Sequence, residues 1–360
     1  MPGTPPVEDL GDGVWSLPVP IPGNPLGFTY VYALTGGDGP VLIDTGWDHD
    51  DSWDALVAGL ARIGHRVEEV RGAVLTHFHP DHTGLTGRLR ASSDAWLAMH
   101  PADIAVTEHL LARDEDTRLR ELADRTRAAG FPEDDIAELL AGPRHAPPPV
   151  VPDLALPDGA RVDLPGRDLR AVWTPGHTPG HLCLHLADGG RLFTGDHVLP
   201  RITPHIGLFP PADGEGDPLG DYLSSQRAVG ALPGADALLC LPAHEHRFTG
   251  PAARAAEIAR HHEDRLGEII TLLRGHGPAT LWEVSSGLAW RRPWTGMGVR
   301  SHHMAAAETA AHLRLAERRG LAARTGTRGL PRWVAVTAPN APRIGSLATG
   351  PGAAPGTTDE

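Results

Sequence analysis

The sequence has no lysine, and all 32 of its basic residues are arginines. We interpret this absence as a coding bias, and it excludes no class of function. Cysteine is nearly absent as well, because the 360 residues include only Cys183 and Cys240, both within apolar, strand-like runs. Two such cysteines argue against a disulfide framework and for a reducing compartment, so we expect a cytoplasmic location.

Long apolar segments are also missing. No run approaches the roughly 18 residues that a membrane-spanning helix needs, so we expect no membrane partner. Residues 1–10 contain neither a basic nor an apolar segment, so we expect no secretory signal. A hydrophobic content of 41% still supports a packed core, and the length suits one large domain and a smaller one.

The acidic charge is unevenly distributed along the chain. Residues 1–250 carry 18 arginines against 36 acidic residues, whereas residues 251–337 carry 13 arginines against 7. The corresponding net charges are −18 and +6. The first region should therefore repel polyanions, while the second could attract them.

Strand-like and helical patterns alternate throughout residues 1–250. A helix is expected where Trp53, Leu56, Val57 and Leu60 share one face. The expected strands are at 28–34, 41–44, 73–76, 95–99, 168–173, 181–186, 191–194 and 237–241. Each half of this region has several strands and flanking helices, which predicts an α/β fold of two packed sheets with helices outside.

Residues 101–150 differ from this pattern. Their first part, 101–142, is polar and helical, with Leu119, Leu122 and Ala123 on one face, and a proline-rich linker follows from Pro143. We interpret the segment as a helical insertion that caps a site.

Residues 251–337 predict a small winged-helix-like domain. A helix near 257–274 would bury Leu266, Ile269, Ile270 and Leu273, and a short one would start at Pro278. The third helix would be capped by Ser301, stopped by Gly320, and would bury Met304, Ala307, Ala311 and Leu315. Residues 321–336 predict a two-stranded wing, and the tail 338–360 is expected to be disordered. The histidines expected to be solvated in this domain are His261, His262, His302 and His303.

Three histidines and one carboxylate occupy the six positions from His77 to His82. They follow the apolar run 73–75, so they should lie on the loop where a buried strand leaves the core. Such a loop can direct His77 and His79 to one point while Asp81 and His82 face a second. Imidazoles and carboxylates suit borderline divalent ions such as zinc, so the stretch predicts a metal site.

Further candidate ligands lie at the ends of other predicted strands. They are His177, Asp196 and His244, with Asp44 upstream of the histidine-rich loop. A single loop of this kind is a weak signal, but four of them in this order, after four strands, indicate one site. We expect the neighbouring His181, His197 and His246 to pack around it.

This set of residues resembles the metallo-β-lactamase superfamily over roughly residues 10–250. The resemblance implies an αβ/βα four-layer sandwich whose site holds two divalent ions, zinc first, with iron or manganese as alternatives. It assigns His77, His79 and His177 to one ion, Asp81, His82 and His244 to the other, Asp196 to a bridging position, and Asp44 to the orientation of a ligand histidine. A bridging aspartate is similar to hydroxyacylglutathione hydrolases, lactonases and ribonuclease Z. The C-terminal region resembles the winged-helix extension of the β-lactamase-like protein 2 group.

The expected reaction is hydrolysis by a hydroxide shared between the ions, with Asp81 orienting it and accepting its proton. A small thioester, ester or lactone is the first choice of substrate, bound against an apolar loop at 202–211 with Phe28 and Tyr30. Cleavage of single-stranded RNA is the alternative, favoured by the net charge of +6 over residues 251–337. A nuclease would need a row of basic residues leading to the metal site, and only Arg201 and Arg247 lie near the ligand loops in the sequence. A purely DNA-reading role ranks third, and the C-terminal module could instead narrow the pocket or form a homodimer contact.

Overall fold

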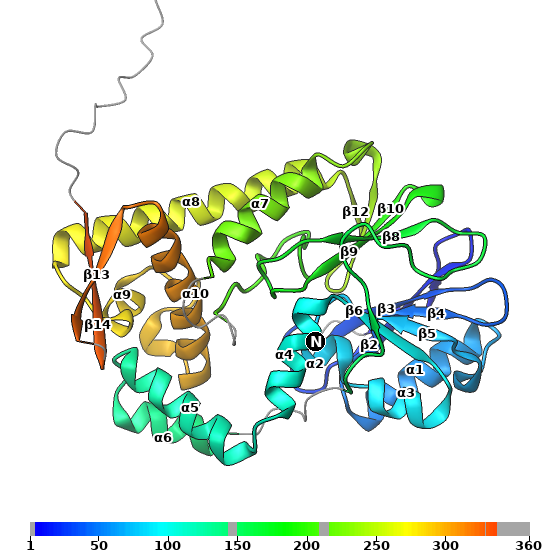
Figure 1. Ribbon diagram of the computed structural model, residues 1–360, viewed down its shortest axis with the longest axis horizontal. Coiled ribbons are helices and arrows are strands. Elements are labelled where there is room, and N and C mark those ends of the chain that lie inside the picture. Colours follow the sequence, from blue (N-terminus) through cyan, green and yellow to red (C-terminus); the bar gives the residue numbers. More distant parts are fainter. Residues whose placement is uncertain (1–3, 143–149, 209–215, 328, 337–360) are drawn as a thin grey trace, which may run out of the picture.

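The computed structural model describes residues 4–142, 150–208, 216–327 and 329–336 (Figure 1). The expectations for the tail 338–360, for residues 143–149 of the proline-rich linker 143–152 and for the end of the apolar loop, 209–211, lie outside these residues. Within the described residues, none of the helices has an apolar stretch that could span a bilayer.

The first sheet has seven strands in the order in which they occur in the sequence. Its antiparallel part joins β1 to β4, and β4, β5, β6 and β7 then run parallel. The strands are β1 (Glu8–Asp9), β2 (Val14–Pro20), β3 (Phe28–Leu34), β4 (Val41–Ile43), β5 (Gly72–Val74), β6 (Trp96–Met99) and β7 (Leu154–Ala155). Because parallel strands end at the same edge, the loops after β4 and β5 lie together.

The second sheet has five strands in the order β12-β11-β10-β9-β8. Its strands are β8 (Leu169–Trp173), β9 (Leu182–Leu186), β10 (Arg191–Gly195), β11 (Leu239–Pro242) and β12 (Phe248–Thr249). β10 and β11 are parallel, so the segments after them also leave the sheet at one edge.

Helices cover the outer face of each sheet, and the apolar inner faces pack together. Between the sheets, Tyr32 of β3 meets Phe193 of β10 edge to face, with ring centroids 5.2 Å apart. The helices of residues 1–250 are α1 (Asp50–Arg62), α2 (Pro80–Thr83), α3 (Thr86–Ser92), α4 (Pro101–Leu111), α5 (Glu115–Ala128), α6 (Glu133–Ala141) and α7 (Pro218–Gly230). The predicted four-layer α/β sandwich is confirmed.

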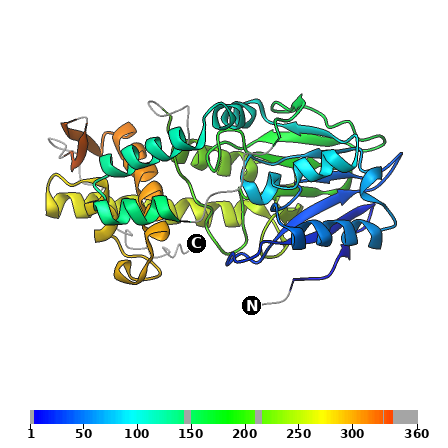
Figure 2. The same cartoon turned by 90° about the horizontal axis from the view of Figure 1, so that it is seen from below.

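The C-terminal region contains α8 (Pro251–His276), α9 (Leu281–Gly287), α10 (Val299–Arg318) and the hairpin β13 (Ala322–Thr327)–β14 (Leu330–Ala335). Helix α8 is long because its buried positions recur every three or four residues, which gives one apolar stripe over its length. It runs from the second sheet to the far end of the molecule (Figure 2).

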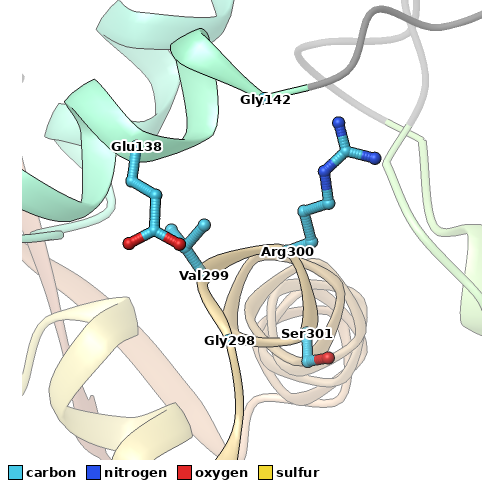
Figure 3. A pocket seen from close by; sticks show the side chains of 6 residues that line it. All are labelled: Glu138, Gly142, Gly298, Val299, Arg300 and Ser301. Carbon is cyan, nitrogen blue, oxygen red and sulfur yellow. The ribbon is translucent and has the colours of Figure 1, made fainter.

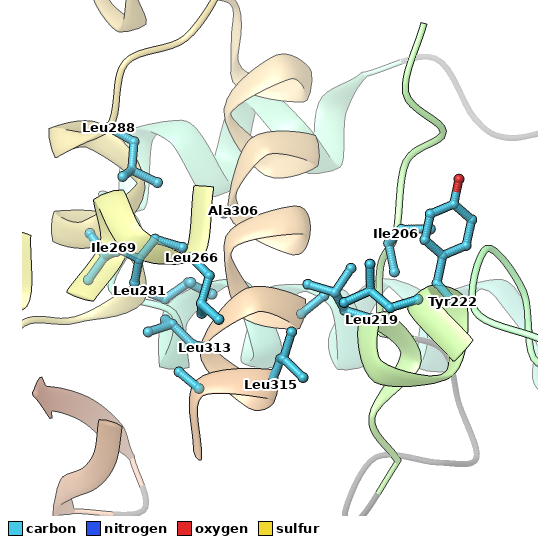
Figure 4. Close-up of a cluster of buried hydrophobic side chains, with 14 of the residues drawn as sticks. Ile206, Leu219, Tyr222, Leu266, Ile269, Leu281, Leu288, Ala306, Leu313 and Leu315 are labelled. Carbon is cyan, nitrogen blue, oxygen red and sulfur yellow. The ribbon is translucent and has the colours of Figure 1, made fainter. Parts of the chain in front are cut away.

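One hydrophobic core joins this region to the sandwich. Ile206, Leu219 and Tyr222 pack against α10, and the same cluster continues to Leu266 and Leu281 (Figure 4). The predicted domain boundary at residue 250 therefore does not coincide with a break in the core. The division of the chain into two domains stays a prediction.

Four expectations for the C-terminal helices are wrong. One concerns His302, whose side chain is only 13% exposed because it stacks on Trp294. Helix α10 begins two residues before Ser301, after an N-cap at Gly298, so Ser301 lies inside the helix. Met304 is 48% exposed, because α10 presents Ala305 and Ala306 to the core instead. His262 is fully buried, since it lies on the apolar stripe of α8.

The helices of the inserted segment pack on two different parts of the molecule. After α5, the Ala129 carbonyl accepts a hydrogen bond from the Trp282 N–H at 2.9 Å, and Phe131 packs on the Trp282 ring. Helix α4 instead contacts the strand-end loops, as described below. Coverage of a bound substrate by this segment stays a prediction.

A hollow of about 230 Å³ lies between α6 and the start of α10 (Figure 3). Glu138 of α6 and Arg300 of α10 lie on opposite sides of it. None of its lining residues is a predicted metal ligand.

Candidate metal centre

The loop after β5 brings His77 and His79 together. Pro80 occupies the first position of α2, where its missing N–H costs nothing, and so ends the loop at His79. Nε2 of His77 lies 3.0 Å from Nδ1 of His79. Asp81 and His82 lie inside the short helix α2, which begins where the loop of the two histidines ends.

Asp44 fixes this loop from the neighbouring strand. It adopts a left-handed backbone conformation (φ 62°) directly after β4. Its carboxylate accepts a hydrogen bond from the Thr76 N–H at 2.7 Å and lies 2.8 Å from Nδ1 of His82. A carboxylate at Nδ1 sets the tautomer that leaves Nε2 of His82 available to a ligand.

The turn between β8 and β9 delivers His177. Nε2 of His177 lies 3.1 Å from Nδ1 of His79, and its Nδ1 lies 2.8 Å from the His205 carbonyl. Gly176 is required here, because its φ is +134° and a Cβ would overlap the backbone of Tyr222.

Asp196 and His244 follow the parallel strands β10 and β11. One Asp196 oxygen, Oδ1, lies 3.5 Å from Nε2 of His82 and 3.3 Å from Nε2 of His244. The other oxygen, Oδ2, lies 3.7 Å from Nε2 of His177. Asp196 thus faces both sets of histidines, and Asp81 lies 3.4 Å from Nε2 of His244.

The side chains form overlapping groups that could each hold a cation. These groups are His77 with His79 and His177, His77 with His82 and Asp196, and Asp81 with His82 and His244. All seven residues named from the sequence are therefore brought to one place.

The atoms at this place fit divalent cations. Nε2 of His82, Oδ1 of Asp196 and Nε2 of His244 are buried and have no hydrogen-bond partner in the described chain. Burying polar atoms without partners is costly, and nitrogen and carboxylate oxygen are the ligands that zinc and similar ions take.

Two of these groups, His77 with His79 and His177 (the first group) and Asp81 with His82 and His244 (the second group), differ in their electrostatics. Burial lowers the pKa of each histidine in the first group, to about 3 for His79. Burial also opposes charge on His82 and His244, but the adjacent carboxylates prevail, raising the pKa of His82 well above its usual value and that of His244 to about 10. In turn these imidazoles outweigh burial and lower the pKa of Asp81 to about 2.

Asp103 is a residue of the site that sequence reasoning missed. It lies on α4, is fully buried, and accepts hydrogen bonds from the Phe78 N–H (3.1 Å), the Thr178 hydroxyl (2.7 Å) and the Gly180 N–H. Its carboxylate therefore ties the loop of His77 and His79 to the loop of His177. Burial raises its pKa to about 7, although these hydrogen bonds oppose the shift.

The sequence contained one signal for Asp103: it lies in the first turn of the helix that follows β6. Nothing in that pattern indicates which loops the carboxylate would reach.

The other histidines near the site behave in different ways. His181 is buried as expected, and its Nε2 accepts a hydrogen bond from the Asp196 N–H at 3.2 Å. His197 is buried as well and packs against the rings of His181 and Tyr222. His246 is exposed, so the expectation that it packs around the site is wrong, because the chain turns outward after Glu245.

Comparisons with known proteins agree with this geometry. A family model described as the metallo-beta-lactamase superfamily matches residues 24–244. A beta-lactamase-like protein 2 homolog from Caenorhabditis elegans is 25% identical over 291 residues, 80% of each chain. A hydroxyacylglutathione hydrolase from Cereibacter sphaeroides is 30% identical over 201 residues, 56% of each chain.

Among solved structures, a metallo-beta-lactamase family protein from Thermus thermophilus is similar over 91% of this chain and 100% of its own, with 31% identity and a TM-score of 0.74. Such coverage includes much of the C-terminal region as well as the sandwich.

Proposed function

The chain belongs to the metallo-beta-lactamase superfamily, and from this premise we propose that it is a hydrolase that requires two divalent cations and cleaves a small thioester, ester or lactone. The observation that supports this proposal most is that seven histidine and aspartate side chains lie close together. Some of their buried polar atoms have no hydrogen-bond partner in the described chain. Zinc is the proposed cation, with iron or manganese as alternatives.

The proposed ligands keep the assignment made from the sequence. His77, His79 and His177 would hold one cation, Asp81, His82 and His244 the other, and Asp196 would lie between them. When bound, such cations supply Lewis acidity and lower the pKa of coordinated water to about 7.

The chain's own groups complete the reaction. Asp81 is 16% exposed and lies 3.4 Å from Nε2 of His244, and its carboxylate would orient the attacking water and accept its proton. Asp44 holds His82 through Nδ1, and the His205 carbonyl holds His177 in the same way. Neither a serine nucleophile nor an organic cofactor is needed.

A thioester is the preferred substrate class. The similarity to a protein named hydroxyacylglutathione hydrolase supports it, and so does the net charge of −18 over residues 1–250, which disfavours polyanions. We further propose that α8–α10 and the β13–β14 hairpin act as a winged-helix-like module that shapes the pocket or joins two copies. Two free, buried cysteines support a cytoplasmic location.

Cleavage of single-stranded RNA is the second candidate, because residues 251–337 carry a net charge of +6. The arginines closest in sequence to the ligand loops do not favour it. Arg201 is paired with Glu245 at 3.1 Å and Arg247 with Glu8 at 2.8 Å, so neither adds an uncompensated charge.

The test compares turnover by the zinc-loaded protein of a panel of acyl thioesters, esters and lactones with cleavage of a labelled RNA oligomer. We expect hydrolysis of at least one small acyl substrate, abolished by a chelator and restored by added metal. Cleavage of RNA without turnover of any acyl substrate would reverse the ranking.

A further inference from the structure

A second hollow, of about 510 Å³, lies where the sandwich meets the C-terminal region. It is lined by Arg201, Ile202, Thr203, Glu245 and Arg291. Its volume falls within the range of roughly 300–1,000 Å³ that is typical of small-molecule sites.

This hollow is built from the same loops as the candidate metal centre. Glu245 directly follows His244, a proposed ligand. The segment 201–203 continues to His205, whose carbonyl lies 2.8 Å from Nδ1 of His177. The hollow therefore adjoins segments that contact the candidate metal centre, which makes it a candidate position for the part of a substrate remote from its reactive carbonyl.

The walls of the hollow are held in place from two sides. The Glu245 carboxylate accepts hydrogen bonds from the Arg201 N–H at 2.9 Å and the Ile202 N–H at 3.1 Å. Arg254 of α8 donates to the carbonyls of the same two residues at 2.9 and 3.0 Å. Glu245 also has a left-handed backbone (φ 70°), a strained conformation for a residue with a side chain.

The charges in the hollow do not cancel. Arg201 and Glu245 neutralise each other, since Nε and Oε1 are 3.1 Å apart. Arg291, from the segment after α9, has no acidic partner within ion-pair distance among the described residues. The charge of the Arg291 guanidinium is therefore not neutralised within the hollow. Guanidinium groups bind carboxylates and phosphates through paired N–H donors.

We propose that this hollow is the subsite for the anionic group, phosphate or carboxylate, on the thiol carrier of a thioester substrate, with Arg291 as its recognition residue. The proposal rests on the function proposed above. In the reaction, the water oxygen bonds to the acyl carbon, the C–S bond breaks, and the carrier leaves as a thiolate that takes up a proton; the products are a carboxylate and a thiol.

The test uses three thioesters of one acyl group: a coenzyme A thioester with phosphates, a glutathione thioester with carboxylates, and a neutral N-acetylcysteamine thioester. The variants are Arg291→Ala and, as the matched control, Arg292→Ala, the adjacent exposed arginine that does not line the hollow. For each variant, kcat/KM for the better anionic thioester is divided by kcat/KM for the neutral thioester. We expect Arg291→Ala to lower this ratio about tenfold or more, mainly by raising KM for the anionic thioester. Arg292→Ala should leave this ratio unchanged.

Binding of free coenzyme A and free glutathione to the metal-loaded protein, measured by calorimetry, separates this inference from the proposed function. Weaker binding of one carrier by Arg291→Ala alone supports the subsite and identifies its anion, even if no thioester is hydrolysed. An equal loss for both arginine variants, or no loss for either, overturns the subsite while turnover of the neutral thioester still tests the proposed function.

Discussion

Four histidines of the candidate metal centre, His77, His82, His177 and His244, are buried like the pair His262–His312 in the C-terminal region, yet their surroundings differ. Nδ1 of His262 lies 3.2 Å from Nε2 of His312, and the ring of His262 packs on Tyr222. The described chain places no carboxylate oxygen within ion-pair distance of this pair, whereas Asp196 lies among the site histidines.

The pKa shifts of this pair are opposite to those of His82 and His244, although burial also lowers the pKa of His77, His79 and His177. Burial lowers the pKa of His262 to about 2 and that of His312 to about 4. In the site, the carboxylates outweigh burial and raise the pKa of His244 to about 10. We therefore expect cation binding to depend on the carboxylates that lie among the site histidines, and not on buried imidazoles alone. The following predictions test this comparison.

Asp196→Ala should have the largest effect, because it removes the carboxylate that faces both histidine groups. We expect kcat/KM to fall by about 10³-fold or more, or ~4 kcal/mol of transition-state stabilisation, while the circular dichroism spectrum stays unchanged. Asp188→Ala, at an exposed ion pair with Arg167, is the control and should keep its activity. Full turnover by Asp196→Ala would disprove the two-cation mechanism.

Zinc binding should depend steeply on pH because of the second group. The carboxylates keep His82 and His244 protonated near neutral pH in the absence of a cation, so a cation must displace these protons. Affinity should rise about tenfold per pH unit for each proton displaced as the pH increases from about 6 to about 8. Calorimetry in buffers of different ionisation enthalpy measures the protons released; binding without proton release would contradict the prediction.

Asp103→Asn should have an intermediate effect on metal affinity. The amide keeps the size of the carboxylate but places an NH₂ group against the donors from Phe78, Thr178 and Gly180, which loosens both loops. We expect zinc to bind about 10–100-fold more weakly, as measured by competition with a chelator. Asp116→Asn, on the exposed side of α5, is the matched control, and equal affinities for the two variants would exclude a positioning role for Asp103.

The double replacement of His262 and His312 by leucine should have the smallest effect. Zinc content should not change, and stability near neutral pH should change by no more than about 1.5 kcal/mol, because both partners are replaced together. The lowered pKa values mean that the unfolded chain takes up protons that the folded chain does not, so the wild type should lose stability as pH falls below about 6.5.

The variant should lose less over the same interval, and denaturant titrations at several pH values measure the difference. A fall in zinc content in the double variant would show that the pair belongs to the metal centre.

The local parts of the site were predictable from the sequence. His77, His79, Asp81 and His82 lie within six residues, so any loop that leaves a strand at residue 74 must bring them close together. The strands at 28–34 and 182–186 were likewise predictable, because alternating or continuous apolar residues of this length bury one or both faces of a sheet.

The solvent exposure of single C-terminal residues was not predictable in the same way. His262 resembles a polar residue on a helix surface until α8 is extended to 26 residues and packed on α7. Met304 is apolar, as most core residues are, but it lies on the solvent-facing side of α10. Both depend on which helix covers which face, and this is decided by packing over the whole chain.

The sequence alone determined the types of the candidate metal ligands and their order along the chain, because each of them follows a strand whose apolar pattern is local. The tertiary structure decided which other residues hold the ligand loops in place and which charges lie beside them. It put Asp103 of α4 between two loops that are distant in the sequence, and it left Arg291 uncompensated beside the neutral Arg201–Glu245 pair. These contacts join distant segments through single hydrogen bonds and charges, which leave no periodic pattern in the sequence.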